Sequence, residues 1–187
     1  MNHPNINRQK FLKGDYKMPE VYSEKALEKA NEIYNTNESV KQAVEASNAV
    51  KSEGKGKWTR VQEVLSYIKH RGYGKVGLAY CAGFRNEADA LAEIFAGGGV
   101  ELSKVACNVG GRGCNPIGQA IILNEIGTDF NIVMGLCMGH DVLFQKFSDA
   151  PSTVLVIKDR AASHNPIMPL RDESWRQKLS EDVWVKA

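Results

Sequence analysis

Four cysteines are the residues of this chain whose type best suits chemistry: Cys81, Cys107, Cys114 and Cys137. They are separated by 26, 7 and 23 residues, so they lack the closely spaced cysteine pairs that structural zinc sites use. Thiols in this pattern can bind an iron–sulfur cluster or another metal, act as redox groups, or fill space in a core. The fold that positions them decides between these roles.

Four short apolar runs alternate with helical segments in the second part of the chain. The runs are 76–80, 105–106, 130–136 and 153–157, and the second belongs to a strand predicted over 102–106. This alternation is typical of βαβ units, whose crossover connections make neighbouring strands parallel. We therefore predict an α/β protein, a Rossmann-like three-layer sandwich. Its sheet would be mainly parallel, with four or slightly more strands and helices on both faces.

Local signals predict where the helices of this sandwich begin and end. Thr59 and Gln62 form a capping box, which starts a helix that ends near Gly72. Three further helices are predicted to start at Asn86, at Asn115 before Pro116, and at about Gly139.

Changes in composition predict three parts of the chain. Residues 1–57 form an N-terminal helical extension that packs on the core, with an arm over 1–19, two helices broken near 35–37 and a loop over 52–57. Residues 58–170 form the α/β domain that carries the metal or thiol site. Residues 171–187 form a C-terminal helical tail anchored by Trp175 and Trp184.

The predicted strands place all four cysteines near one edge of the sheet. Cys81, Cys107 and Cys137 each follow a different strand, and Cys114 lies in the loop before the Pro116 helix. The carboxyl ends of parallel strands meet at one edge, where α/β proteins bind their ligands. Helix N-termini at the same edge lower the pKa of thiols. We therefore predict all four cysteines as metal ligands, although Cys107 also fits an inert core thiol.

Other polar residues fall in the same loops. His140 and His164 are candidates for proton transfer, and Arg112 and Arg160 for holding a substrate anion. Candidates for cofactor contacts are Asn108, Gly113 and Asn115. Both histidines also fit roles as capping or hydrogen-bonding loop residues, and 158–160 also fits a solvated strand end. The glycines at 110, 111, 113 and 118 match neither common template for a nucleotide-binding loop.

The charge balance narrows the class of partner. The chain has 24 basic and 22 acidic residues, a formal net charge of +2, so nothing points to nucleic acid. The sequence lacks a predicted leader and an apolar run long enough for a membrane span, and we expect a cytoplasmic protein. The predicted partner is a small-molecule substrate or a redox partner, and a homo-oligomer is left open.

Three motifs resemble a known family. They are Cys-Asn-Pro at 114–116, Gly-Leu-Cys-Met-Gly-His-Asp at 135–141, and Lys-Asp-Arg with His-Asn-Pro over 158–166. Over roughly residues 60–170 the chain is similar to an uncharacterised bacterial and archaeal family described as predicted metal-binding proteins. Members of that family open with a cysteine-rich segment, whereas residues 1–80 contain no cysteine. The resemblance therefore implies a metal bound by the core cysteines.

Three functions are compatible with these observations. The first is a metal-binding protein with an iron–sulfur cluster of the [4Fe-4S] type, or zinc, acting in redox or desulfidase-type chemistry on a small molecule. Desulfidases offer only an analogy, because their motifs do not align with this chain. The second is a metal-free thiol enzyme or redox protein, with Cys114 or Cys137 as the reactive thiolate and a histidine as base. The third is a zinc-stabilised interaction module.

Overall fold

The computed structural model describes residues 24–111 and 113–182. By its internal contacts the chain divides into two compact units, Met1–Glu45 and Ala46–Ala187. The predicted N-terminal arm and Trp184 lie outside the described residues. Within the described ranges, no helix is both long and apolar enough to cross a membrane.

Two helices, α2 (Glu24–Thr36) and α3 (Glu38–Gly54), lead into the sheet domain, and the chain divides within α3. The predicted break between them is confirmed, since Asn37 lies outside both helices and its side chain accepts a hydrogen bond from the Val40 N–H group. None of the residues of α2 is buried. The loop predicted over 52–57 begins later than expected, because α3 continues through Gly54, whose backbone packs against the ring of Trp58.

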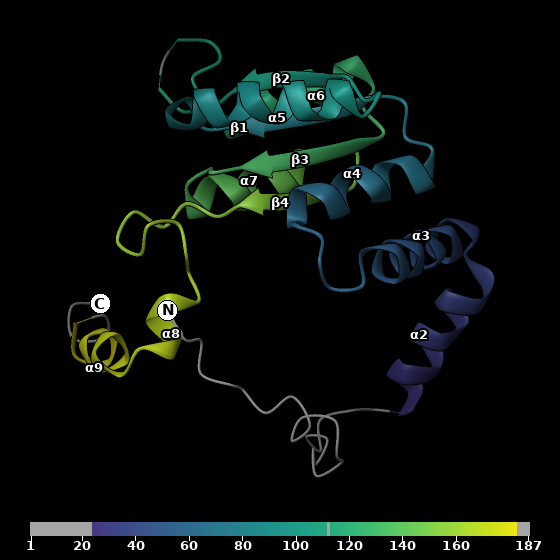
Figure 1. Ribbon diagram of the computed structural model, residues 1–187, viewed down its shortest axis with the longest axis horizontal. Helices are drawn as coiled ribbons and strands as arrows, with labels where there is room; N and C mark the ends of the chain where they lie inside the picture. The colour runs from purple at the N-terminus through teal and green to yellow at the C-terminus, as the bar shows by residue number, and fades with distance from the viewer. Residues whose placement is uncertain (1–23, 112, 183–187) are drawn as a thin grey trace. The chain divides into compact units, whose positions relative to one another are not determined.

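The second unit has the predicted α/β architecture (Figure 1). After α3 its elements are α4 (Arg60–Arg71), β1 (Val76–Tyr80), η1 (Ala82–Phe84), α5 (Arg85–Gly97), β2 (Leu102–Ala106), α6 (Pro116–Ile126), β3 (Phe130–Met134), α7 (Met138–Phe147), β4 (Ser152–Val156), α8 (Met168–Arg171) and α9 (Glu173–Asp182). The sheet has four parallel strands in the order β2-β1-β3-β4. The predicted parallel sheet and three-layer sandwich are confirmed.

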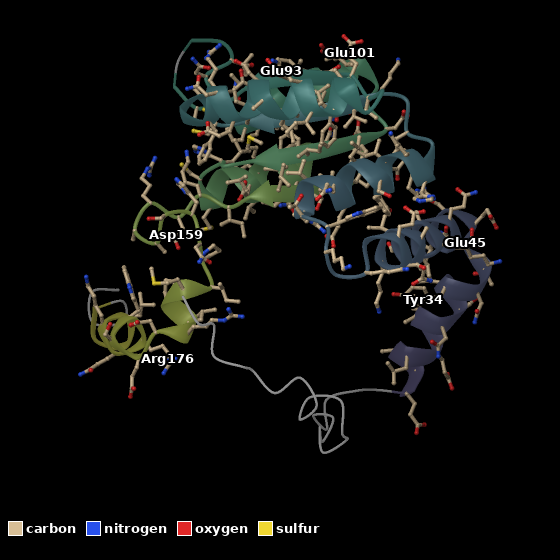
Figure 2. The ribbon with its side chains drawn as sticks, in the orientation of Figure 1. Tyr34, Glu45, Glu93, Glu101, Asp159 and Arg176 are labelled. Atoms are coloured by element: carbon tan, nitrogen blue, oxygen red, sulfur yellow. The ribbon has the colours of Figure 1, made fainter. Side chains whose placement is uncertain are left out.

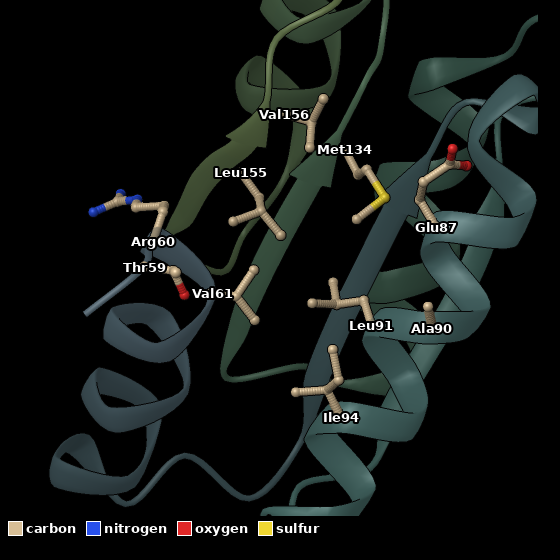
Figure 3. A pocket seen from close by; sticks show the side chains of 10 residues that line it. All are labelled: Thr59, Arg60, Val61, Glu87, Ala90, Leu91, Ile94, Met134, Leu155 and Val156. Carbon is tan, nitrogen blue, oxygen red and sulfur yellow. The ribbon is translucent and has the colours of Figure 1, made fainter. Parts of the chain in front are cut away.

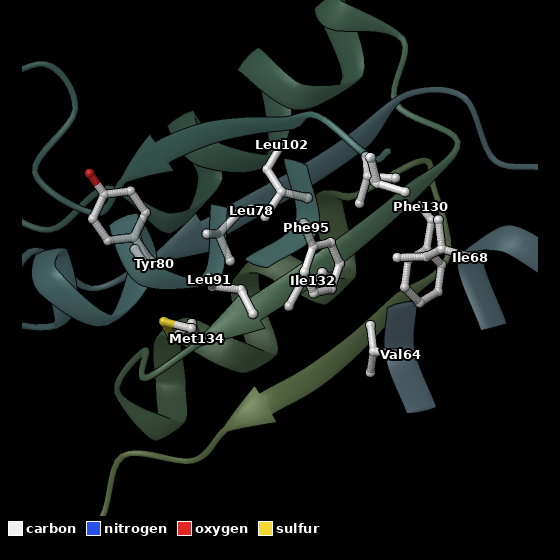
Figure 4. Close-up of a cluster of buried hydrophobic side chains, with 13 residues drawn as sticks. Val64, Ile68, Leu78, Tyr80, Leu91, Phe95, Leu102, Phe130, Ile132 and Met134 are labelled. Atoms are coloured by element: carbon white, nitrogen blue, oxygen red, sulfur yellow. The ribbon is translucent and has the colours of Figure 1, made fainter. Parts of the chain in front are cut away.

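Two apolar clusters hold the layers together. On one face of the sheet, side chains of α4 and α5, among them Ile68, Leu91 and Phe95, pack against alternate strand residues such as Leu78 and Ile132 (Figure 4). On the other face, side chains of α6 and α7 pack against the remaining strand residues, among them Ala79, Val105 and Val133. Because strand side chains alternate between faces, strands covered on both sides need an almost wholly apolar sequence.

Three of the predicted helix boundaries agree with the structure. The capping box of Thr59 and Gln62 starts α4, and Gly72 ends it in the left-handed conformation. Asn115 caps α6 through a hydrogen bond from the Gly118 N–H group. The prediction that Asn86 caps α5 is wrong, since α5 begins at Arg85 directly after the turn η1. That turn changes the direction of the chain in place of a polar cap.

A pocket of about 460 Å³ lies between α4 and α5 over the sheet (Figure 3). Its walls are almost wholly apolar and include Val61, Leu91, Ile94 and Leu155. Met134 and Val156, the last residues of β3 and β4, line one end of it. None of the residues lining this pocket is a cysteine or histidine, so the chemistry predicted from the sequence lies elsewhere.

Candidate functional site

The carboxyl ends of the four strands bring the predicted thiols to one edge. The strands end in register, with Tyr80 paired to both Ala106 and Met134, and Met134 paired to Val156. The chain then continues into Cys81 after β1, Cys107 after β2, Cys137 three residues after β3, and Lys158 two residues after β4. All four cysteines are free thiols.

Backbone hydrogen bonds extend the sheet beyond the ends of its strands. The Cys107 N–H group donates to Tyr80 O at 2.8 Å, and the Cys81 N–H group donates to Met134 O at 3.0 Å. A third bond joins Gly135 N to Val156 O at 2.7 Å. The positions of Cys81 and Cys107 are therefore fixed by the sheet and not by flexible loops.

Lys158 contacts two of the thiols. Its Nζ lies 2.7 Å from Cys81 Sγ and 3.9 Å from Cys137 Sγ. Burial raises the pKa of Cys81, but Lys158, the Gly83 N–H group and the Cys107 thiol outweigh it and bring this pKa below its usual value. Burial disfavours the charge of Lys158 in turn, yet the two sulfurs raise its pKa. The contact between Cys81 and Lys158 thus favours the thiolate form of the one and the ammonium form of the other.

Phe84 supports Lys158 from the turn that follows β1. Lys158 Nζ lies 5.8 Å from the centre of the Phe84 ring, in a cation–π arrangement. Gly135 adopts a φ of 63°, and a side chain at this position would overlap the same ring. The ring of His164 packs edge-on against Phe84, with 4.9 Å between ring centres. Phe84 is thus held between Gly135 and His164 beside the ammonium group.

Cys107 is a buried thiol with two sulfur neighbours. It is 4% exposed, its Sγ accepts a hydrogen bond from Ala82 N at 3.3 Å, and Cys114 Sγ lies 3.7 Å away. Burial, followed by the neighbouring sulfurs of Cys114 and Cys81, raises the pKa of Cys107 to about 11 against the effect of the Ala82 N–H group. Cys107 therefore remains a protonated thiol at neutral pH.

Cys114 lies at the surface, on the loop between β2 and α6. The Asn115 N–H group donates to Cys107 O at 2.6 Å and closes this loop. Gly110, Gly111 and Gly113 all have φ values in the left-handed region, between 73° and 92°, where residues with a Cβ are strained. The glycines therefore let the loop turn back so that Cys114 reaches Cys107.

Asp141 is a partly buried acid near Lys158 that the predicted site residues did not include. It lies in the first turn of α7, and its Oδ1 is buried without a hydrogen-bond partner among the described residues. Burial raises the pKa of Asp141 to about 6, although the charges of His140 and Lys158 act in the opposite direction. A carboxyl group with this pKa exchanges its proton near neutral pH.

The predicted catalytic residues occupy different surroundings. His164 Nδ1 is bonded to the Asp159 N–H group at 3.1 Å, in the loop after β4 that carries Asp159 (Figure 2). His140 lies in the first turn of α7, and Arg160 is exposed but close enough to lower the pKa of Lys158 slightly. Arg112 lies outside the described residues. Among the described residues neither imidazole ring is hydrogen-bonded to a cysteine sulfur, whereas the backbone N–H group of His140 donates to Cys137 O at 2.8 Å.

The predicted cofactor contacts lie on the loop that carries Cys114. Asn108 and Gly113 are exposed there, and Asn108 O accepts a hydrogen bond from Gly111 N at 3.1 Å. The side chain of Asn115 is occupied by capping α6, with 2.8 Å from its Oδ1 to Gly118 N. These residues shape the loop around Cys114.

The arrangement does not form a ready metal site. Among residues 24–111 and 113–182, no three His, Cys, Asp or Glu side chains are grouped so that they could hold a metal ion. Lys158 contacts both Cys81 and Cys137, and a positive charge therefore already occupies the space beside these two sulfurs. Metal ligation by the four cysteines is therefore not confirmed by the described residues and stays a prediction.

Sequence reasoning did not identify Lys158, Phe84 or Asp141 as site residues. The position of Lys158 carried a usable signal, because it follows the fourth strand at the edge where the other strands deliver cysteines. Phe84 and Asp141 carried none, since an apolar residue in a turn and an acid in the first turn of a helix are common without function.

Comparisons with known proteins place the chain in a family without a known function. The family model described as "Protein of unknown function (DUF1847)" matches residues 18–113 and 111–155. The chain is 42% identical over 171 residues to the uncharacterized protein MJ0455 of Methanocaldococcus jannaschii, covering 82% of this chain and 88% of that protein. No solved structure matches the chain. The expected membership in an uncharacterised family is thereby confirmed, and the chain belongs to the DUF1847 family of proteins of unknown function.

Proposed function

We propose that this protein is a cysteine-dependent enzyme or thiol redox protein that acts without a metal, with Cys81 as its nucleophile. The observation that carries this proposal is the distance of 2.7 Å between Lys158 Nζ and Cys81 Sγ. The thiolate is the nucleophilic form of cysteine, and an adjacent lysine stabilises it. This choice differs from the sequence-based prediction, which placed a metal-binding protein first and, for a metal-free thiol enzyme, named Cys114 or Cys137 with a histidine as base.

The surroundings of Cys81 fit this role. Cys81 is partly exposed and therefore open to a small molecule, whereas Cys107 beside it is buried. The Gly83 N–H group and the Cys107 thiol also donate hydrogen bonds to the Cys81 sulfur. Charge-assisted hydrogen bonds of this kind are stronger than neutral ones. The site is built to hold a negative charge on one particular sulfur.

The neighbouring charges indicate the class of substrate. Lys158 places positive charge beside Cys81, and the exposed Arg160 lies close enough to Lys158 to interact with its charge. They favour a small molecule that carries or develops negative charge where the thiolate attacks. Asp141 lies close enough to interact with Lys158 and can exchange a proton near neutral pH.

The test is the rate at which each cysteine of the full chain is alkylated, followed by mass spectrometry between pH 5 and 10. We expect Cys81 to react as the thiolate at the lowest pH, and Lys158→Met to slow it roughly five-fold at pH 7, since the thiolate fraction sets the rate. Lys104→Met is the matched control. Lys104 lies on the edge strand β2, and its Nζ pairs with Asp89 of α5 at the same distance of 2.7 Å. An unchanged rate of Cys81 in Lys158→Met would overturn the proposal.

A metal centre is the second candidate. It is favoured by four free thiols from separate elements at one edge, with Cys107 in contact with both Cys81 and Cys114. An iron–sulfur cluster or zinc would need Lys158 to move away from Cys81 and Cys137. Elemental analysis with an absorbance spectrum of protein purified without oxygen separates the two candidates. Stoichiometric metal that protects Cys81 from alkylation would favour the metal centre.

A further inference from the structure

Three sulfur atoms follow one another along the carboxyl edge of the sheet. Cys81 and Cys107 come directly after the paired residues Tyr80 and Ala106, and the Cys107 sulfur lies 3.3 Å from the backbone nitrogen of Ala82, the residue next to Cys81. The sulfur of Cys114 lies 3.7 Å from that of Cys107. The series therefore runs from the lysine-bound Cys81, through a buried thiol, to an exposed one.

The loop that carries Cys114 permits a bond between the last two sulfurs. A disulfide requires about 2.05 Å between its sulfur atoms, so the sulfurs of Cys107 and Cys114 must approach further. Cys107 is fixed by the sheet, whereas Cys114 is exposed on a loop that contains three glycines in the left-handed region. The loop stays closed during such a movement, because its base is the hydrogen bond between Asn115 N and Cys107 O.

From this series we infer that the substrate class of the site is a low-molecular-weight disulfide, and that Cys107 and Cys114 resolve the mixed disulfide formed on Cys81. This inference rests on the proposed function of Cys81 as the nucleophile. It adds the direction of electron transfer: the protein would give two electrons to the substrate and end with a disulfide between Cys107 and Cys114.

The exchange proceeds in three balanced steps. The Cys81 thiolate attacks one sulfur of a disulfide RS–SR, forms a mixed disulfide and releases RS⁻, which takes up a proton. Cys107 loses its proton and attacks the Cys81 sulfur, which forms a Cys81–Cys107 disulfide and releases the second RS⁻. Cys114 loses its proton and attacks the Cys107 sulfur, so that Cys81 returns as the thiolate.

The net change is the oxidation of two protein thiols to one disulfide and the reduction of RS–SR to two RSH. Attack by Cys107 is favoured by position, because it follows the strand paired with that of Cys81 and its sulfur lies beside Ala82. Attack by Cys114 is favoured because its sulfur already lies 3.7 Å from that of Cys107. Excess RSH reverses all three steps, re-forms RS–SR and restores the reduced protein.

The experiment treats the reduced full chain, without oxygen, with an aromatic disulfide whose released thiolate absorbs visible light. In the wild type we expect about two thiolates per chain in the fast phase, and no adduct mass on the protein. Peptide mapping should find the new disulfide between Cys107 and Cys114. Cys114→Ser should stop with a Cys81–Cys107 disulfide, and Cys107→Ser should stop with the aromatic adduct on Cys81.

Controls separate the resolving step from the nucleophile and from folding. Lys104→Met should behave as the wild type, because Lys104 lies on β2 and its ammonium group pairs with Asp89 at 2.7 Å. Cys107→Ala serves as a second variant, since it leaves no buried hydroxyl, and thermal melts confirm that each variant folds. A wild-type chain that keeps a stable adduct on Cys81 would overturn the resolving step and leave the nucleophile standing. Absence of a fast phase at Cys81 would overturn both.

Discussion

At the amino edge of the sheet the buried side chain of Asn131 forms hydrogen bonds through both its oxygen and its nitrogen, whereas at the carboxyl edge two buried polar atoms have no partner among the described residues. Asn131, in β3, accepts a hydrogen bond from Thr128 Oγ1 and donates one to Ser148 Oγ, both at 2.9 Å. Just before this strand, Asp129 Oδ2 accepts the N–H groups of Gly74 and Lys75 at 2.9 and 2.8 Å. These bonds join the connections around the starts of β1 and β3.

The carboxyl edge is less completely satisfied. Gln119 Nε2 donates to Tyr80 O and Val105 O, but its Oε1 is buried and has no partner among the described residues. Asp141 Oδ1 is likewise buried and has no hydrogen-bond partner among the described residues. Buried polar groups without partners cost free energy, and they are concentrated where a protein binds or reacts. The difference indicates that the amino edge stabilises the fold and the carboxyl edge carries the function.

The largest effect is expected from disturbing the amino edge with Gly77→Ala. A Cβ at this position in β1 would overlap Asn131 Oδ1 and come within 2.9 Å of Leu123, so overpacking should lower the free energy of unfolding by about 3 kcal/mol. Gly74→Ala is the control, since its nearest neighbour would lie at 3.8 Å. Denaturant titration measures both. Equal stability of the two variants would contradict the tight packing described for this edge.

A smaller loss of stability, together with a change in reactivity, is expected from Gly135→Ala at the carboxyl edge. Gly135 has a φ of 63°, and a Cβ there would overlap the Phe84 ring. We expect a loss of about 2 kcal/mol and slower alkylation of Cys81, because Phe84 supports Lys158. Gly127→Ala, at the end of α6 with a φ of 71°, should lose stability but keep the wild-type rate at Cys81. Identical rates in the two variants would refute the role given to Phe84.

The smallest effect concerns the charge of Asp141. Folding raises its pKa from 3.8 to about 6 through burial, so the folded state holds this proton more tightly than the unfolded state. The stability it contributes is present below about pH 4 and is lost as the pH rises through 6. Asp141→Asn cannot lose a proton, and it should be more stable than the wild type by about 1 kcal/mol at pH 7.5, since part of the shift is screened by solvent.

Thermal unfolding at pH 4 and pH 7.5 checks this prediction, with Asp149→Asn as the control. Asp149 is exposed shortly after the same helix, α7, so its variant should show no pH-dependent gain. A gain for Asp141→Asn that is equal at both pH values would mean that burial of the charge is not its cause.

The parts of the fold that depend on local sequence were predicted well. Two helix starts depend on residues within a single turn of the chain, namely Thr59 with Gln62 and Asn115 with Pro116. The apolar runs likewise identify the strands that are buried on both faces. The cap predicted at Asn86 was wrong. The turn η1 brings Phe84 toward Lys158, and α5 therefore begins at Arg85, one residue before Asn86. Here a contact with a distant strand end outweighed the local signal.

The site was predicted only in part, for a related reason. The sequence showed that the cysteines follow strands. Because the carboxyl ends of parallel strands all meet at one edge, the cysteines could be expected there without knowing the order of the strands. The contact between Lys158 and Cys81 joins residues 77 positions apart, and it depends on the lysine reaching across from β4. Neither the order of the strands nor the direction of a side chain can be read from a single sequence.

The strand order β2-β1-β3-β4 also has a topological consequence. From β1 the chain winds to one side to reach β2, and then returns across β1 to continue on the other side with β3 and β4. The connections that leave β1 and β3 therefore depart in opposite directions, and doubly wound α/β proteins bind their ligands beside the ends of strands that part in this way. Cys81 and Cys137 follow those two strands, and Lys158 contacts both. The reversal in winding thus brings the ends of β1 and β3 together, so that Lys158 can contact the cysteine that follows each of them.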